Sequence, residues 1–475
     1  MPADRSKLPA LGPDPGIHLP RIAKHRDANT ALRLWTVEHR ELPVLNFVLL
    51  LPVGIAADPA DRPGLAAFTA DMLDEGSGAS DSFAIHERLA RIGGVFDTEV
   101  GADATMVSLT TLAKFARPAL ELLSEIMMAP RFDPEDVRRV RALRLSRLMQ
   151  LRDVPSALAE RVFASRLYGS HPYGHTAMGT EASLNAITVG ELRTFHEECY
   201  RRSQPVLVAA GDASHQEIVD LVGETWGKAG KWGGAEGVEV APCEKTPAVV
   251  LAPRTPGAPR IAIVDRPGAA QSELRVGRVA AARSTPDFHT LGVLNTALGG
   301  AFVSRINLKL REEKGYTYGA RSSFEFRRQT GPFAVQASVQ TDATAESVDD
   351  VLREIAEMGG ERPITADELA RAQAALVRGF PRGFETAEQI SRAMCQLALY
   401  DLPDDYFDLF VPRVKAVTSE AVTSAAARYL PSRDMEVVVV GDRERVMASL
   451  LRLGLGEPVD LSASQDIALA SASTS

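Results

Sequence analysis

An internal repeat constrains the fold of this chain more than any other feature. A helix-like stretch that begins near Thr188 leads to an apolar run and then to a turn at Gly211. The same order recurs from Thr418 to a turn at Gly441. Each landmark lies 230 residues from its counterpart, so the spacing inside the two copies is the same. A duplication of this kind predicts two domains that share one fold.

The segment between the copies has the composition of a linker. Residues 227–260 are rich in glycine, proline, lysine and small side chains and have little apolar periodicity. Such a segment is typical of a chain that crosses the protein surface. We therefore predict domains at 20–230 and 261–457, joined by a linker at 231–260.

Apolar periodicity predicts the fold class of both domains. Residues 45–51, 104–112 and 333–340 have the pattern of β-strands. Residues 115–128 and 345–358 repeat apolar side chains with the period of an α-helix. Strands and helices that are mixed without strict alternation indicate an α+β fold, in which helices cover a mainly antiparallel sheet.

Composition excludes several classes of protein. The 475 residues are 45% hydrophobic and 24% charged, which is typical of a folded globular chain. The formal charge is -9 and no long basic block occurs, so we expect no nucleic-acid partner. No apolar run reaches the roughly 18 residues that a membrane span needs. Residues 1–20 have no apolar core of a signal peptide, and we expect a soluble protein of the cytoplasm or periplasm.

The three cysteines match no disulfide or metal-binding pattern. Cys199, Cys243 and Cys395 are far apart and odd in number. This pattern matches neither a set of disulfides nor a zinc ribbon, so the sequence predicts ordinary buried thiols.

Residues 64–77 resemble the signature helix of the pitrilysin family of zinc peptidases, M16, which includes insulinase and the mitochondrial processing peptidases. In that family the helix carries His-x-x-Glu-His, where two histidines bind zinc and the glutamate activates the bound water. Here Ala67, Ala70 and Asp71 stand at these three positions. The resemblance therefore implies a chain with no metal and no cofactor of its own.

The family's third ligand is a glutamate on a later helix. Counting along the chain places this ligand at Arg147 and its supporting glutamate at Val140. We expect Asp71 and Arg147 to form an ion pair in the vacated site. The alternative, that Asp71 still anchors a metal, is disfavoured because zinc takes about four ligands and a guanidinium repels a cation.

Two histidines have the spacing of a helical zinc site. His171 and His175 are four residues apart, but Pro172 and Gly174 lie between them and disfavour a helix. This segment resembles the family's His-Pro-Tyr loop, and we predict a structural role. A substrate contact or an adventitious metal is the alternative.

The second half resembles the family's C-terminal domain at residues 264–272, 298–305 and 310–318. Arg311 and Tyr318 match an arginine and a tyrosine that act on substrate in this family. Such donors stabilise the oxyanion that forms when a peptide carbonyl is attacked. Without the resemblance, both side chains would be assigned to a solvated helix face and a strand. The family also implies a clamshell arrangement of its two domains.

The resemblance implies a division of labour between two chains. A homologous partner subunit with an intact His-x-x-Glu-His would supply zinc and base, and this chain would supply Arg311 and Tyr318 to a heterodimer. An extended peptide substrate would add as a strand to a sheet edge, and Phe96, Asp97 and Thr98 mark the candidate edge.

Three functions remain open from the sequence. The first is the non-catalytic subunit of a heteromeric zinc endopeptidase. The second is a structural assembly subunit, like the family-related core proteins of a respiratory complex, and the third is a peptide-binding module that acts alone as a homodimer. A zinc-independent hydrolase is disfavoured because no Gly-x-Ser-x-Gly or Cys/His arrangement occurs.

Overall fold

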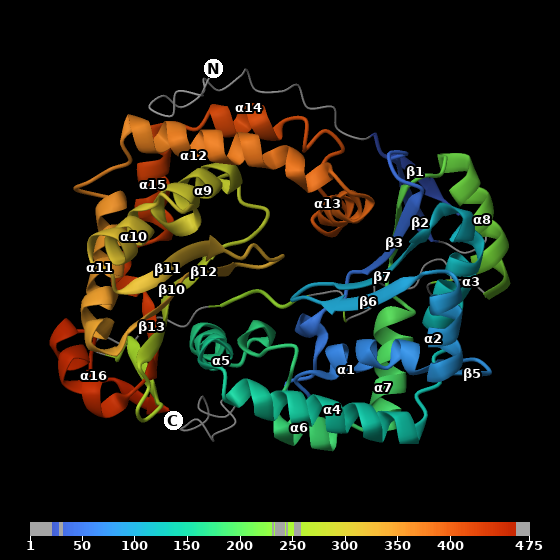
Figure 1. Cartoon of the computed structure of the whole chain (residues 1–475), viewed down its shortest axis with the longest axis horizontal. Coiled ribbons are helices and arrows are strands. Elements are labelled where there is room, and N and C mark those ends of the chain that lie inside the picture. The colour runs from blue at the N-terminus through green and yellow to red at the C-terminus, as the bar shows by residue number, and fades with distance from the viewer. Residues whose placement is uncertain are drawn as a thin grey trace, which may run out of the picture.

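The computed structural model describes residues 21–27, 32–229, 232, 243, 246–250 and 258–461. It has an α+β architecture in which two halves, each built around one six-stranded sheet, face each other (Figure 1). The predicted fold class is confirmed. Most of the predicted linker lies outside the described residues, so the domain boundaries stay a prediction.

The first sheet is mixed but mainly antiparallel. Only β2 and β8 run parallel, and each other neighbouring pair is antiparallel. The strand order is β1 (Ala23–Arg26), β2 (Arg33–Glu38), β8 (Val206–Gly211), β3 (Val44–Leu51), β7 (Thr105–Leu112) and β6 (Val95–Val100). A small hairpin, β4 (Gly76–Ser77) with β5 (Ser80–Asp81), lies apart from this sheet.

The second sheet repeats this arrangement in five of its six strands. Its strand order is β11 (Thr317–Phe324), β12 (Gly331–Gln340), β10 (Gln271–Ala281), β13 (Glu436–Gly441), β9 (Ile261–Asp265) and β14 (Val459–Leu461). The parallel pair β9 and β13 matches β2 and β8, and β11 matches β6 as the free edge. The sixth strand differs, because β14 runs parallel to β9 and comes last in the chain, whereas β1 runs antiparallel to β2 and comes first. In the other strands the duplication in the sequence is a duplication of the fold.

Helices of each half cover the outer face of its own sheet. Strand β3 shows why, because Leu45, Phe47 and Leu49 alternate with residues of the opposite face and belong to the outer core. The helices of the first half are α1 (Leu65–Asp71), α2 (Ser82–Arg91), α3 (Ala116–Met128), α4 (Pro134–Arg152), α5 (Pro155–Tyr168), α6 (Glu181–Ala186), α7 (Val189–Phe195) and α8 (His215–Ala229).

The second half has a matching set of helices. Val437 and Val439 of β13 face the core under these helices, as the odd residues of β3 do in the first half. The helices are α9 (Phe288–Asn295), α10 (Arg305–Asn307), α11 (Thr344–Met358), α12 (Ala366–Gly379), α13 (Ala387–Leu399), α14 (Phe410–Lys415), α15 (Ser419–Tyr429) and α16 (Arg443–Leu450). None of the described helices is long and apolar enough to cross a membrane.

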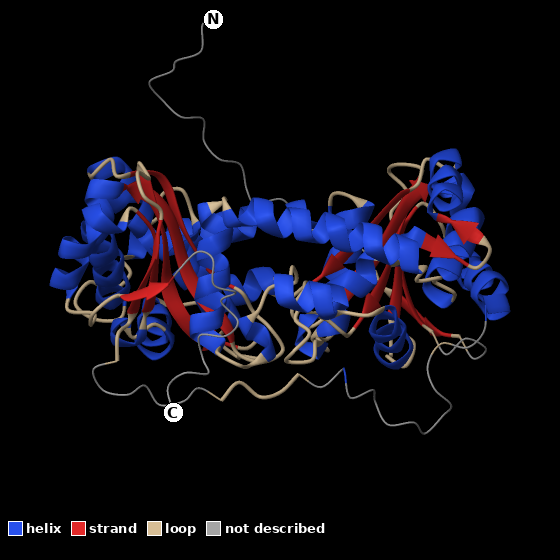
Figure 2. Ribbon diagram, turned by 90° about the horizontal axis from the view of Figure 1, so that it is seen from below, coloured by secondary structure: helices blue, strands red, loops and turns tan. Residues whose placement is uncertain are grey.

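The inner faces of the sheets are covered by helices exchanged between the halves. Helix α13 of the second half packs on β3 and β8 of the first, and α5 of the first half packs on β10 and β13 of the second. Figure 2 shows helices bridging the space between the two sheets. Both faces of the central strands are thus buried, which explains their nearly continuous apolar sequence.

A polar cluster fastens the halves at one further point. Asp103 accepts hydrogen bonds from the Tyr173 hydroxyl at 2.5 Å and the Thr246 hydroxyl at 3.0 Å. Its second oxygen accepts the backbone N–H of Arg328, 2.8 Å away. Asp103 is buried, so these bonds are formed away from water, where an unpaired carboxylate would be costly. One carboxylate therefore joins the first half, the segment between the halves and the second half.

Candidate functional site

Helix α1 carries the positions of the lost zinc motif, and its start is fixed by polar contacts. Gly64 precedes the helix with φ +92°, a conformation that favours glycine. The Asp58 carboxylate accepts the backbone N–H groups of Gly64 and Ala66, each at 2.7 Å. His175 Nε2 lies 2.9 Å from the same carboxylate. The helix is held rigidly although it has no metal ligands to present.

The two candidate histidines have separate partners. His171 Nε2 lies 3.0 Å from the carbonyl oxygen of Pro247, and its Nδ1 accepts the backbone N–H of Tyr173. His175 contacts Asp58 instead. The two imidazoles thus support the loop and helix α1, and they form no shared metal site.

The vacated metal site is filled by apolar and ion-pair contacts. Ala67 and Ala70 are buried, and the Asp71 carboxylate forms an ion pair with Arg144 of α4. The Arg144 guanidinium is only 7% exposed and also donates to the carbonyl oxygen of Ala177 at 2.7 Å. The predicted pair between Asp71 and Arg147 is wrong, since Arg147 is exposed and has no ion pair among the described residues.

The helical stripe of α4 explains this error. Val137, Val140, Arg144 and Leu148 are its buried residues, spaced three or four apart, and position 147 falls outside that stripe. The sequence of α4 does not mark this stripe, because the apolar residues Leu143 and Met149 of the same helix are exposed.

These residues do not fit a zinc ion. Two alanines offer no donor atom, and the carboxylate of Asp71 is already bound by a cation. Burial raises the pKa of Asp71, and the Arg144 guanidinium opposes that rise. Within the described part of the chain, no three His, Cys, Asp or Glu side chains are grouped so that they could hold a metal.

The Asp71 pair gives a prediction about stability. Asp71→Ala should lower the free energy of unfolding by about 2 kcal/mol, because it leaves the buried Arg144 without its carboxylate; the partial exposure of Asp71 keeps the loss below that of a fully buried pair. Urea denaturation followed by circular dichroism would measure it. Arg147→Ala is the control and should change stability by less than about 0.5 kcal/mol. A larger loss of stability from Arg147→Ala than from Asp71→Ala would instead support an ion pair between Asp71 and Arg147.

The candidate substrate edge is a free strand edge next to helix α1. Strand β6, which contains Phe96, Asp97 and Thr98, pairs with β7 alone among the described strands and lies beside α1. Its residues alternate between exposed and half-buried. This geometry is compatible with strand addition by a peptide, and the role of the three residues stays a prediction.

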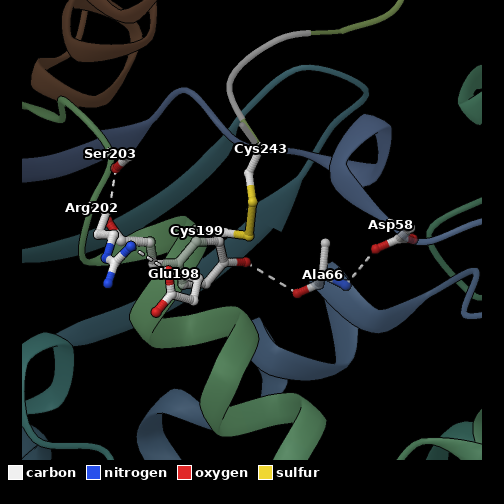
Figure 3. The surroundings of a disulfide bond; sticks show 8 residues. Asp58, Ala66, Glu198, Cys199, Arg202, Ser203 and Cys243 are labelled. Atoms are coloured by element: carbon white, nitrogen blue, oxygen red, sulfur yellow. Dashed lines mark hydrogen bonds and ion pairs between the residues drawn. A yellow bond between two sulfur atoms is a disulfide. The ribbon is translucent and has the colours of Figure 1, made fainter. Parts of the chain in front are cut away.

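A disulfide lies close to helix α1 (Figure 3). Cys199 and Cys243 are bonded across a sequence separation of 44 residues, with their Cα atoms 5.5 Å apart. Figure 3 shows the bridge beside the contacts that hold Ala66 and Asp58. The prediction of free thiols is wrong for these two cysteines and is confirmed for buried Cys395. The spacing contains no motif, so only the tertiary structure reveals this pair.

Breaking the disulfide should destabilise the protein. Cys199→Ser with Cys243→Ser should lower the free energy of unfolding by about 3 kcal/mol, because the unfolded chain regains the freedom of the closed loop. Denaturation with and without dithiothreitol would measure it. The reductant should destabilise the native protein and leave the double variant unchanged, and equal sensitivity of both would contradict the bridge.

Arg311 and Tyr318 line one cavity of about 440 Å³ in the second half. Arg311 lies in the short helical turn η8 (Leu308–Glu313), and its guanidinium stacks 4.2 Å from the ring centre of Phe302. Its Nη1 is buried and has no hydrogen-bond partner among the described residues, and the Glu312 carboxylate lies 3.5 Å from it. The structure therefore brings the two predicted substrate donors together, and it leaves bonding capacity of the arginine unused.

A β-bulge directs Tyr318 outward. Thr317 pairs with Val339 and Ala320 pairs with Ala337, so Tyr318 and Gly319 oppose a single residue of β12. The Thr317 hydroxyl donates to the carbonyl oxygen of Ser338 at 2.7 Å and fixes the bulge. Tyr318 is 93% exposed as a result. A tyrosine this exposed on a strand contributes nothing to the core, and its hydroxyl makes no hydrogen bond to any residue that the structure describes.

The cavity has hydrogen-bond donors suited to a peptide carbonyl, and its lining residues include no histidine and no unbonded carboxylate. An arginine and a phenol donate hydrogen bonds to a carbonyl oxygen or to an oxyanion. The lining residues include one carboxylate, Glu273, and both of its oxygens are bound, by Arg275 and by the Ser338 hydroxyl. None of the degenerate zinc positions lines this cavity. The sequence missed the stacking residue Phe302 and the second arginine of the cavity, Arg321.

Comparisons with known proteins agree with this geometry. Residues 37–181 match the family model described as "Insulinase (Peptidase family M16)", and residues 186–376 match "Peptidase M16 inactive domain". An "Uncharacterized zinc protease" of Mycobacterium tuberculosis is 26% identical over 409 residues, which cover 85% of this chain and 90% of that protein.

A plant protein and a solved structure extend the comparison. An Arabidopsis thaliana chain named "Probable mitochondrial-processing peptidase subunit beta" is 20% identical and is matched over 86% of this chain and 76% of its own length. The crystal structure of a peptidase M16 inactive domain from Pseudomonas fluorescens superposes with a TM-score of 0.78 and 26% identity, over 89% of this chain and 98% of that one.

Proposed function

Because this chain belongs to the insulinase family of peptidases, M16, and carries no zinc motif in α1, we propose that it is the substrate-binding subunit of a heteromeric zinc endopeptidase. It has no peptidase activity by itself. One asymmetry carries the proposal. The metal positions are closed by alanines and an ion pair, whereas Arg311 and Tyr318 remain open in a cavity.

The partner subunit supplies what this chain lacks. A homologous chain with an intact His-x-x-Glu-His brings zinc and the base that activates water. Arg311 and Tyr318 hold the carbonyl oxygen of the scissile peptide and keep it in line with the attacking group. The peptide backbone adds as a strand to the free edge of β6 or β11, which are equivalent edges of the two sheets.

A purely structural role is the second candidate. It would follow the example of assembly subunits, in which the cleft has lost all function. The donor pair argues against this role. Nη1 of Arg311 is buried and makes no hydrogen bond within the described residues, and its ion pair with Glu312 is long at 3.5 Å, so a ligand would offset part of its desolvation cost. A peptide-binding module without a partner is the third candidate.

Co-purification tests the proposal. The tagged chain would be recovered from its native source, and the companion chain would be sequenced. We expect a companion with His-x-x-Glu-His and a chelator-sensitive cleavage of unfolded casein that neither chain shows alone. Stoichiometric zinc and chelator-sensitive cleavage in the isolated chain would contradict the proposal. Peptide binding without any companion would favour the third candidate.

The disulfide supports an oxidising compartment. Bridges such as Cys199–Cys243 persist outside the cytosol, where glutathione does not reduce them. We therefore favour the periplasm or another extracytosolic space over the cytoplasm. Alkylation of the protein taken directly from its source would then label one cysteine, Cys395, after unfolding; labelling of all three would place the protein in a reducing compartment.

A further inference from the structure

The cavity beside Tyr318 contains a second arginine that needs an explanation. Arg321 lies on β11, opposite Gln336 of β12 in the strand register, and both residues line the cavity with Arg311. Arg321 is exposed and forms no ion pair within the described residues. The nearest recorded carboxylate of Arg311 is Glu312, which is half exposed and 3.5 Å away. Two guanidinium groups therefore line one cavity, and little carboxylate charge balances their positive charge.

The carboxylate of Glu273, which also lines the cavity, does not neutralise Arg311 and Arg321. Glu273 is buried, and its Oε1 accepts a hydrogen bond from Arg275 while its Oε2 accepts the Ser338 hydroxyl. Arg275 is in turn bound to Glu160 of the exchanged helix α5, 3.2 Å away. This inner arginine has two carboxylate partners, whereas Arg311 and Arg321 have a single long contact between them. The charge that the cavity presents to a ligand is positive.

We propose that this cavity binds a carboxylate of the substrate peptide through Arg311 and Arg321, either an Asp or Glu side chain or the C-terminal carboxylate. The inference rests on the proposed peptide-binding function and adds a substrate class to it. A neutral backbone carbonyl would be satisfied by Tyr318 and one arginine. A second guanidinium matches the two oxygens of a carboxylate and removes the repulsion between the cations.

Four labelled peptides test this inference in the full-length chain. Each is a fluorescein-labelled 12-residue peptide of uncharged residues, and the set combines one internal Glu or Gln with a free or an amidated C-terminus. Fluorescence anisotropy gives the Kd of each for the native protein, for Arg321→Gln and for Arg138→Gln. The last is a matched control, because Arg138 is exposed on α4 and lines no part of the cavity.

We expect the native protein and Arg138→Gln to bind one carboxylate form about tenfold more tightly than its amide counterpart. Arg321→Gln should abolish that preference and leave the affinity for the doubly neutral peptide unchanged. A preference for Glu over Gln identifies a side chain, and a preference for the free over the amidated end identifies the terminus. Equal binding of all four peptides overturns the inference and leaves peptide binding intact. Absence of binding to any peptide, by this chain or by its complex, overturns the proposed function as well.

Discussion

Arg311→Ala should lower kcat/KM of the assembled peptidase about 100- to 1,000-fold while the complex forms normally, since one transition-state donor is worth that much. The loss should appear mainly in kcat, because the bond strengthens as the carbonyl oxygen becomes an oxyanion. Cleavage of a fluorogenic peptide by the reconstituted pair would measure it. Arg311 is partly exposed and lies in a short turn, so its removal should leave the fold unchanged.

Tyr318→Phe tests the second proposed donor by a smaller change. It removes one hydroxyl from a side chain that is 93% exposed, so an effect on stability is not expected. Activity should fall about tenfold or more through the lost hydrogen bond. Arg138→Gln serves again as the control with unchanged activity. Full activity of both Arg311→Ala and Tyr318→Phe would favour the structural assembly subunit.

The exchanged helix gives the largest expected effect on stability. Ile390 of α13 is fully buried against the inner face of β3 and β8, together with Met394 and Leu397. Ile390→Asp should lower the free energy of unfolding by more than about 4 kcal/mol, because it places a carboxylate among apolar side chains. Calorimetry should show a much lower Tm, and limited proteolysis should cut the chain between the halves more rapidly.

Two further variants define this effect. Ile390→Ala, which should still fold, is expected to cost about 3 kcal/mol through the cavity that it leaves. Arg392→Ala on the exposed side of the same helix removes half-exposed ion pairs with Glu99 and Glu388 and should cost less than about 1 kcal/mol. If Ile390→Asp unfolded like Arg392→Ala, the exchanged helix would not hold the two halves together.

The repeat and the apolar patterns carried the fold prediction. Equal spacing of Thr188 with Thr418 and of Gly211 with Gly441 predicted two copies of one fold, and the two sheets share the order of five of their six strands. The strands at 45–51, 104–112 and 333–340 appear as β3, β7 and β12. Periodicity succeeded here because burial of alternate side chains is imposed residue by residue along a strand.

Part of the candidate site could likewise be predicted from the sequence, and part could not. The losses at Ala67, Ala70 and Asp71 could be read from the sequence because they are identities at fixed positions of one helix. The partner of Asp71 could not be obtained by counting, because the twist of α4 and its contact with α1 decide that Arg144 faces inward. The position of Arg321 likewise depended on the register between β11 and β12, which brings it to the cavity of Arg311.

The sequence by itself determined the duplication, the α+β elements, the lost zinc motif and the retained Arg311 and Tyr318. Only the tertiary structure decided the Cys199–Cys243 bridge, the pair of Asp71 with Arg144 and the exchange of α5 and α13 between the halves. The reason is physical. Periodicity records which side of its own element a residue buries, whereas contacts between distant segments depend on how whole sheets and helices pack against one another.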